Sequence, residues 1–387
     1  MKILIIHNHY SKHSGEESVV YAQVDLLKKQ GHEVITYYRK SSEIENMRLG
    51  KIISFFTAFY NPRSIKAIKG QMRLEKPDIV HVHNLFPLIS PAVLPVIKKT
   101  GVPVVMTVHN YRLSCPNGLF FSQGSICEAC TADGKEFNCI KRNCEGSYYK
   151  SIGYALRNWW ARKKKYYLNN IDAFACLTQF QKQKLINAGF DPEKIQVIPN
   201  MYNGLINRVR SEGEKRKYVA FAGRISPEKG IGLLFDTANK LPHIQFKLAG
   251  AVREGYNLPD KPENVELVGM LDKEELKLFY NHAYLYLLSS IWYEGFPMVF
   301  PEAMNYSLPI IAPNMAGFPE IVEDNFNGLL FDPGNVKDLA NKIEYLYDNP
   351  NIARGFGKNG YKKLQDLYTP DIYYKSLIAL YQSLIKK

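Results

Sequence analysis

Two glutamates eight positions apart, Glu294 and Glu302, are the residues of this sequence best spaced to do chemistry. An apolar run typical of a strand, 284–288, precedes them, and Pro301 fits a helix only within its first turn. We therefore expect Glu294 in a loop at the carboxyl end of a strand, and Glu302 early in the next helix, where open parallel sheets bind ligands. The structural alternative is one solvated carboxylate and one acid favoured by a helix dipole.

A second motif, in the run 222–232, bears on this choice. A short apolar strand, 218–222, ends at Gly223, and a helix with apolar periodicity follows. Arg224 and Lys229 are therefore expected near the start of that helix, where free backbone N–H groups attract anions. Two cations on one side would hold a diphosphate, and two carboxylates opposite would accept hydrogen bonds from ribose and sugar hydroxyls. This combination favours a sugar nucleotide as the ligand.

Motifs along nearly the whole chain, in order, resemble those of retaining glycosyltransferases of family 4. In the second half they are Gly-Arg-x4-Lys-Gly from Gly223, Glu-x7-Glu from Glu294, and the runs 316–322 and 327–330. In the first half the glycine-rich loop 14–17 looks like the acceptor-side loop of that family. The runs 82–90 and 107–116 look like those of a subgroup that builds surface polysaccharides.

Strand and helix patterns alternate along the chain, which predicts an α/β protein with two doubly wound parallel sheets. The resemblance implies the GT-B arrangement, with two Rossmann-like domains facing across a cleft. We expect an acceptor domain in 1–200, carrying a cysteine-rich excursion at 115–145, and a nucleotide-sugar domain in 201–368. The boundary is expected at 199–217, and a last helix, 369–387, is expected to cross back to the first domain.

The resemblance also implies a role for each motif residue. Arg224 and Lys229 would stabilise negative charge on the leaving diphosphate. Glu294 would contact hydroxyls of the donor sugar, and Glu302 the ribose. His109 matches the family histidine that faces the transferred sugar, and its alternative is an ordinary histidine satisfied by its neighbours at a strand end. Further donor contacts are expected from Gly223, Met270, Gly295, Phe296 and Gly317, and acceptor contacts from Gly15, Glu16 and Asn110.

The expected reaction follows from the same resemblance. The chain has no Asp-x-Asp triplet, the usual metal-bridging motif of the other major glycosyltransferase fold. Cations and backbone N–H groups are therefore expected to neutralise the diphosphate without a catalytic metal or other required cofactor. The resemblance implies a hexosyltransferase that takes a sugar from a UDP- or GDP-sugar and retains its anomeric configuration. The implied acceptor is a lipid-linked glycan in bacterial O-antigen, capsule or exopolysaccharide synthesis. The alternatives are an epimerase of the same fold and a non-catalytic scaffold that binds glycan or membrane.

Positive charge gathers in the first half of the chain. Residues 1–200 hold 28 Lys+Arg against 15 Asp+Glu, a net charge of +13, whereas residues 201–387 hold 22 of each. Two basic stretches, 48–73 and 148–167, are also rich in aromatic residues, which suits an anionic membrane surface and a lipid-diphosphate acceptor. The alternative is core aromatics under a solvated basic face. Nucleic acid is not expected as a partner, because no RNA-binding, zinc-finger or helix-turn-helix signature is present.

Length and composition indicate an ordinary two-domain globular protein. The chain has 387 residues, of which 46% are hydrophobic and 22% charged. No apolar run approaches the roughly 18 residues of a spanning helix, and the N-terminus lacks a signal-peptide pattern. We therefore expect a cytoplasmic protein, peripheral on the inner face of the cytoplasmic membrane.

Four cysteines, Cys127, Cys130, Cys139 and Cys144, fall within a short polar stretch. In a cytosolic protein this spacing favours a closed structural zinc site over disulfides, and the alternative is a set of reduced thiols in a loop. Histidines also fall near the ends of two predicted strands, at His7, His9, His81 and His83. We infer no metal site from them, because a pair on one strand face is equally typical of packing.

Overall fold

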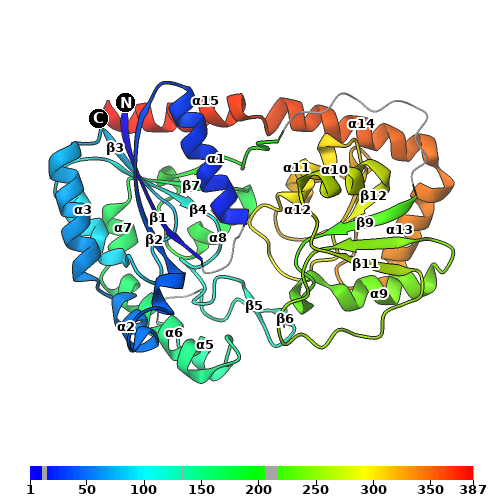
Figure 1. Ribbon diagram of the computed structural model, residues 1–387, viewed down its shortest axis with the longest axis horizontal. Helices are drawn as coiled ribbons and strands as arrows, with labels where there is room; N and C mark the ends of the chain where they lie inside the picture. Colours follow the sequence, from blue (N-terminus) through cyan, green and yellow to red (C-terminus); the bar gives the residue numbers. More distant parts are fainter. Residues whose placement is uncertain (11–14, 132–133, 205–216, 387) are drawn as a thin grey trace. The chain divides into compact units, whose positions relative to one another are not determined.

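The computed structural model describes residues 1–10, 15–131, 134–204 and 217–386, and the chain divides into two compact units (Figure 1). The first unit contains Met1–Gln123, Cys127–Asn200 and Pro370–Lys387, and the second contains Gly124–Ile126 and Met201–Thr369. Each unit has its own six-stranded parallel sheet, which confirms the predicted α/β class. Most of the predicted boundary, 205–216, lies outside the described residues, as does Ser14 of the glycine-rich loop.

The sheet of the first unit has the strand order β2-β1-β3-β4-β7-β8. Its strands are β1 (Lys2–His9), β2 (Glu33–Lys40), β3 (Ile79–Val82), β4 (Val104–Val108), β7 (Ala173–Cys176) and β8 (Ile195–Val197). The chain first adds β2 on one side of β1 and then returns to add β3 on the other side. Ligands of open parallel sheets bind where the order reverses in this way, which here is the carboxyl end of β1 and β3.

Strand β1 is longer than predicted from its apolar pattern. The apolar run covers only residues 3–6, but the strand continues to His9, whose partner in the parallel register is Lys40 of β2. His7 and His9 are buried although they are polar, so the hydrophobic run ends before the strand does. Strand β8 has only three residues, with Gln196 between two apolar ones, and is too short for its sequence pattern to indicate a strand.

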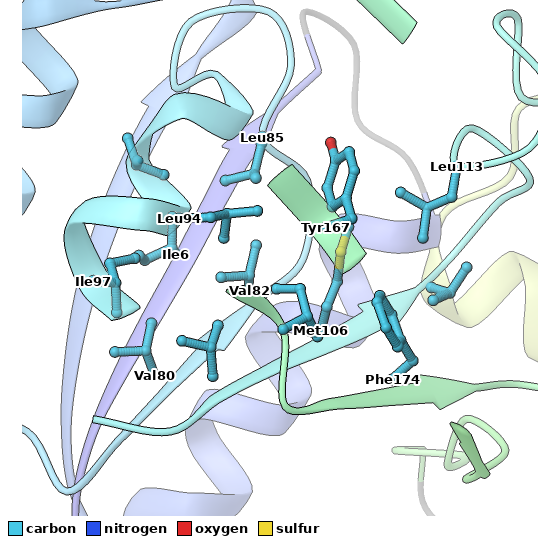
Figure 2. Close-up of a cluster of buried hydrophobic side chains, with 14 of the residues drawn as sticks. Ile6, Val80, Val82, Leu85, Leu94, Ile97, Met106, Leu113, Tyr167 and Phe174 are labelled. Atoms are coloured by element: carbon cyan, nitrogen blue, oxygen red, sulfur yellow. The ribbon is translucent and has the colours of Figure 1, made fainter. Parts of the chain in front are cut away.

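Helices cover the first sheet and enclose an apolar core. They are α1 (Gly15–Lys29), α2 (Gly50–Thr57), α3 (Pro62–Glu75), α4 (Leu94–Lys98), α5 (Asn138–Lys141), α6 (Tyr148–Lys163), α7 (Tyr166–Asn170), α8 (Gln179–Asn187) and α15 (Pro370–Ile385). Two short strands, β5 (Phe121–Ser122) and β6 (Ser125–Ile126), lie in the cysteine-rich excursion. Figure 2 shows part of the core, where Val82, Leu94 and Met106 meet between the strands and α4.

The last helix, α15, packs within the first unit. The Tyr373 hydroxyl donates to Gln23 Oε1 of α1 at 2.6 Å, and Tyr381 is hydrogen-bonded to His81 of β3. Tyr373 and Tyr381 are buried, so this helix contributes apolar area as well as hydrogen bonds to the unit.

The sheet of the second unit has the order β11-β10-β9-β12-β13-β14. Its strands are β9 (Tyr218–Ala222), β10 (Phe246–Ala249), β11 (Val265–Gly269), β12 (Ala283–Leu287), β13 (Ile310–Pro313) and β14 (Gly328–Phe331). Its helices are α9 (Ile231–Lys240), α10 (Lys273–His282), α11 (Val299–Asn305), α12 (Phe318–Ile321), α13 (Val336–Asp348) and α14 (Pro350–Leu367). The order reverses between β9 and β12, as in dinucleotide-binding Rossmann sheets. No helix in the described ranges is both long and apolar enough to span a membrane.

Candidate active site

The segments that follow β9 and β12 meet at the point where the second sheet reverses its strand order. The chain leaves β9 through Gly223 and forms a 3₁₀ turn, Pro227–Lys229, before α9 begins. Gly230 caps α9 at φ +69°, and a Cβ atom on it would lie 1.8 Å from the Ser289 carbonyl oxygen. Only glycine fits both the backbone conformation and this close approach, which brings Lys229 against the residues after β12.

Lys229 and Glu294 form an ion pair across these two segments. The Lys229 Nζ atom lies 2.8 Å from Glu294 Oε1, and the two side chains are 16% and 9% exposed. The Ser290 hydroxyl donates to the same Glu294 oxygen, and the Ser289 hydroxyl donates to the Lys229 carbonyl at 2.8 Å. The sequence indicated cations opposite the carboxylates, whereas the structure pairs one cation directly with one carboxylate. Ser290 was not predicted, because its neighbours alone do not reveal this contact.

Arg224 lies beside a buried carboxylate that the sequence analysis did not select. Glu228 is 5% exposed; its Oε1 atom lies 3.5 Å from Arg224 Nη2, and its Oε2 atom lies 3.3 Å from Arg253 Nη1. The two arginine side chains are more than half exposed. Glu228 therefore holds two solvent-facing guanidinium groups near each other, an arrangement that can bind an anionic group. Arg253 follows a different strand, β10, so local sequence gave no signal for it.

Glu302 occupies the first turn of α11, as predicted. The Tyr280 hydroxyl donates to Glu302 Oε2 at 2.9 Å. Burial raises the pKa of the Glu302 carboxyl to about 7, and the hydrogen bond from Tyr280 acts in the opposite direction. Near neutral pH this group is therefore poised between an acceptor-only carboxylate and a carboxylic acid that can also donate.

The other predicted donor-side residues lie at the ends of strands or beginnings of helices in the same unit. Met270 follows β11 with 74% of its surface exposed. Phe296 is buried against Tyr368, so its backbone rather than its side chain is left to contact a ligand. Gly317 precedes the short helix α12, and Gly295 directly follows Glu294.

A row of histidines crosses the carboxyl ends of β1, β3 and β4 in the first unit. His109 Nε2 lies 2.8 Å from His83 Nδ1, and the two rings stack with centroids 5.1 Å apart. The rings of His83 and His7 lie edge to face at 6.0 Å. Burial lowers the pKa of His7 to about 2 and lowers the pKa values of His83 and His109. His109 is therefore a neutral hydrogen-bonding group near pH 7.

The predicted acceptor-side residues adjoin this row. Glu16 Oε2 accepts a hydrogen bond from the Tyr10 hydroxyl at 3.0 Å, and its Oε1 atom lies 3.8 Å from His7 Nδ1. The Asn110 side chain accepts from the Arg112 backbone N–H at 3.0 Å, so it shapes the turn after β4. A Cβ atom on Gly15 would meet nothing within 4 Å, so no packing contact requires glycine there.

Two clusters contain residue types that bind metals. Among the described residues, one group of three has ligand atoms all within 4.8 Å of one another, namely His7, His9 and Glu17. From the sequence we inferred no metal site at these histidines, because histidines at strand ends are equally typical of packing, and Glu17 was not selected as a ligand. Of the four cysteines, Cys130 and Cys139 pack together with Cys144 beside them. In the described part of the chain, no three of their Sγ atoms all lie within 4.8 Å of one another. Structural zinc therefore stays a prediction.

Two family models match consecutive parts of the chain. Residues 13–203 match the model described as Glycosyltransferase Family 4, and residues 205–363 match the model described as Glycosyl transferases group 1. An uncharacterized glycosyltransferase of Methanocaldococcus jannaschii is 26% identical over 270 residues, which are 68% of this chain and 71% of that protein. The poly(ribitol-phosphate) alpha-N-acetylglucosaminyltransferase of Staphylococcus aureus is 27% identical over 249 residues, 62% of this chain but only 48% of that protein.

Solved structures show the same fold. Sucrose-phosphate synthase from Thermosynechococcus elongatus superposes with a TM-score of 0.71 at 18% identity, covering 100% of this chain and 99% of that one. The Anabaena protein HepE, in complex with UDP, has a TM-score of 0.66 at 18% identity, covering 99% and 100%. These likenesses establish the GT-B type of fold. Because the two family models follow each other along nearly its whole length, this chain belongs to the glycosyltransferases of family 4, with a group 1 domain as its second half.

Proposed function

We propose that this glycosyltransferase moves a sugar, with retention, from a UDP- or GDP-sugar to a hydroxyl of a lipid-linked glycan in bacterial polysaccharide synthesis. The observation that carries the proposal is the Lys229–Glu294 pair, which lies at the strand-order reversal where nucleotide-binding sheets hold their ligands. HepE, at 18% identity, has been solved with UDP and with UDP-glucose, which supports a nucleotide sugar as the donor.

Charge in the second unit suits a leaving nucleoside diphosphate. Lys229, Arg224 and Arg253 supply positive charge, and the first turn of α9 supplies backbone N–H groups. As the bond from the anomeric carbon to the phosphate oxygen breaks, these groups stabilise the charge on that oxygen without a catalytic metal. The acceptor oxygen forms the new bond on the same face, and its proton passes to the leaving phosphate.

Carboxylates and histidine provide the matching polar contacts. Glu294, held by Lys229 and Ser290, accepts hydrogen bonds from hydroxyls of the donor sugar, and Glu302 accepts from the ribose. His109 is kept neutral by burial, so it hydrogen-bonds to the transferred sugar without adding a charge. Glu16 and the turn at Asn110 contact the acceptor.

The names of similar proteins support a role in bacterial polysaccharide synthesis. Similar proteins include the amylovoran biosynthesis glycosyltransferase AmsK of Erwinia amylovora and the capsular polysaccharide biosynthesis glycosyltransferase CapM of Staphylococcus aureus, at 26% and 23% identity. The basic, aromatic-rich stretches of the first unit support work at the inner face of the cytoplasmic membrane, where a lipid-linked glycan is presented.

Calorimetric titration with UDP, GDP and ADP tests the donor site. UDP or GDP is expected to bind the wild-type protein in the micromolar range, and Arg224→Ala and Lys229→Ala are expected to weaken that binding strongly. Lys240→Ala, which removes an exposed lysine at the far end of α9, serves as the matched control and is expected to bind normally. Failure of all three nucleotides to bind would contradict the proposal.

The stereochemistry is tested on the product. With the donor sugar that is turned over, proton coupling at the new anomeric centre is expected to report the configuration of the donor. An inverted product would exclude the retaining mechanism. Conversion of the donor sugar to its epimer, without an acceptor, would favour the epimerase alternative instead.

A further inference from the structure

A cavity of about 590 Å³ lies within the first unit beside α2 and α6. Its lining combines aromatic rings with cationic side chains, among them Phe55, Phe86, Tyr149, Lys150, Arg112 and Arg157. Donor-site residues of the second unit take no part in it. The cavity is therefore a second binding volume, separate from the Lys229–Glu294 pair.

Arg157 of α6 is 4% exposed and yet has no carboxylate within ion-pair distance among the residues that the structure describes. Its guanidinium lies over the rings of Phe86 and Tyr154, at 4.3 and 3.8 Å from their centroids, and Nη2 donates to the Pro116 carbonyl at 3.2 Å. Its Nε atom is buried without a hydrogen-bond partner among the described residues. Ring faces and a single carbonyl leave most of the donors of this guanidinium unused.

Arg112, which is only partly buried, lines the same cavity. Its Nη1 atom donates to Asn84 Oδ1 at 3.3 Å, and its buried Nε atom has no partner among the described residues. Glu16 is near enough to interact electrostatically with Arg112, but no ion pair between them falls within 4.0 Å. Neither arginine forms an ion pair within the described part of the chain.

A buried guanidinium beside a second, partly buried one is costly without an anion. Burial, followed by the neighbouring charge of Arg112, lowers the pKa of Arg157 to about 10. Buried charges in proteins are normally paired, because removing an ion from water costs several kcal/mol. Glu45 also lines the cavity, but it is solvent-exposed, so water screens its charge. A bound phosphate or diphosphate would supply the missing partner bidentately.

Part of the lining is apolar, and the helices that supply it also carry exposed apolar side chains. The rings of Phe55 from α2 and Tyr149 from α6 lie 5.8 Å apart, and Gly153 lets α6 approach Phe55 closely, since a Cβ there would lie 3.2 Å from that ring. Large apolar and aromatic side chains on these two helices, and on the residues that flank α2, are exposed: Leu49, Ile52, Ile53, Phe56, Tyr60, Tyr148, Tyr149 and Ile152. Exposed apolar patches of this kind mark sites that bind an apolar partner.

We propose that the cavity binds the phosphate or diphosphate headgroup of the lipid-linked acceptor on Arg112 and Arg157, while the lipid chain lies on the apolar surface of α2 and α6. This assignment rests on the proposed function and specifies its acceptor. Cationic groups in the lining together with exposed apolar side chains on the same helices match an amphiphile rather than a free sugar or a nucleotide. Lys150, exposed at the rim, adds a third cation to the headgroup site.

Four probes distinguish a lipid diphosphate from a lipid alone, a free diphosphate and a nucleotide as the ligand of the cavity. They are farnesyl diphosphate, farnesol, inorganic diphosphate and UDP, each titrated calorimetrically below its aggregation threshold. Farnesyl diphosphate is expected to bind at least about tenfold more tightly than farnesol or inorganic diphosphate, because each of these lacks one half of the interaction. Equal binding of inorganic diphosphate would overturn the lipid assignment, and equal binding of farnesol would overturn the arginine site.

Three variants test the residues. Arg157→Gln, Arg112→Gln and Lys150→Gln are each expected to weaken farnesyl diphosphate binding, the two arginines by about tenfold or more. Lys163→Gln, an exposed charge removal on the same helix outside the cavity lining, is the matched control and is expected to bind normally. Lys150 is exposed, so its variant gives a result even if an arginine variant does not fold. Unchanged binding in all variants that fold would refute the proposal.

Nucleotide binding distinguishes the two proposals. The cavity variants are expected to bind UDP or GDP as the wild type does, and Lys229→Ala is expected to bind farnesyl diphosphate as the wild type does. If no nucleotide binds while farnesyl diphosphate binding depends on Arg157, the donor assignment fails and the lipid-phosphate site stands. If nucleotides bind and the arginine dependence is absent, the cavity assignment fails alone.

Discussion

At the scale of single residues, the pair Lys229–Glu294 makes the sharpest prediction. Lys229→Ala and Glu294→Ala are each expected to lower kcat/KM by about two orders of magnitude or more, since each removes a preorganised charge at the reacting centre. Steady-state kinetics with the identified donor measure the effect, with Lys240→Ala as the control. Near-normal turnover in either variant would remove that residue from the mechanism.

Stability separates a structural role of this pair from a catalytic one. Lys229→Ala leaves a carboxylate that is only 9% exposed without its cation, and about 1–3 kcal/mol of unfolding free energy should be lost. The double variant Lys229→Met with Glu294→Gln should regain part of that free energy but none of the activity. Recovery of activity together with stability would mean that the pair serves packing only.

Glu302 predicts a pH dependence with a definite sign. The pKa of Glu302 is about 7 in the folded chain against 4.5 for a solvated glutamate, so between these values the folded state keeps a proton that the unfolded state has lost. The contribution of Glu302 to stability therefore falls as pH rises through this window. Urea unfolding measures this effect at pH 5 and pH 8. Between these values, the unfolding free energy of Glu302→Gln should rise relative to that of the wild type by on the order of 1–3 kcal/mol. A parallel pH dependence in both proteins would contradict the assignment.

At the scale of elements, the start of α9 depends on Gly230 but not on Gly232. Gly230→Ala places a Cβ 1.8 Å from the Ser289 carbonyl at φ +69°, and it should cost more than about 1 kcal/mol and disturb the Lys229–Glu294 pair. Gly232→Ala is the matched control, because Gly232 lies within α9 and a Cβ atom on it would meet nothing within 4 Å. That change should be neutral or stabilise the chain by up to about 1 kcal/mol. Chemical denaturation of the two variants, with nucleotide titration, measures both effects, and equal costs would contradict the account.

Most elements were predictable because their patterns are local. Strands such as β9 and β12 appear as short apolar runs followed by glycine or proline, and their predicted limits agree with the structure to within a residue. The pattern failed for β1, where buried histidines continue the strand past the last apolar residue. A polar side chain can complete a strand when neighbouring strands supply its contacts. The residues that supply them are distant in the sequence, so a local pattern does not reveal them.

At the scale of the whole molecule, the charge asymmetry predicts salt-sensitive attachment to membranes. All of the net charge of +13 belongs to residues 1–200, so sedimentation with anionic vesicles should weaken as ionic strength rises. Replacing Lys163, Lys164 and Lys165 by glutamine should weaken it further. The control is the same change at the exposed Lys240, Lys337 and Lys358 in the second half, which should have little effect. Vesicle binding that ignores salt would exclude the electrostatic part of the attachment.

The sequence by itself determined the fold class, the family and the element on which each motif residue lies, because hydrophobic periodicity, glycine turns and helix starts are local properties. Only the tertiary structure decided which of these residues meet. Lys229 pairs with Glu294 because β9 and β12 are neighbours at the strand-order reversal, and His83 meets His109 because β3 and β4 are neighbours. Arg157 has no ion-pair partner in the described ranges, because the elements packed around it bring aromatic rings and a carbonyl to its guanidinium instead of a carboxylate. Charge balance in a buried site depends on which side chains the packed elements bring within a few ångströms of one another. Separation along the chain does not predict these contacts.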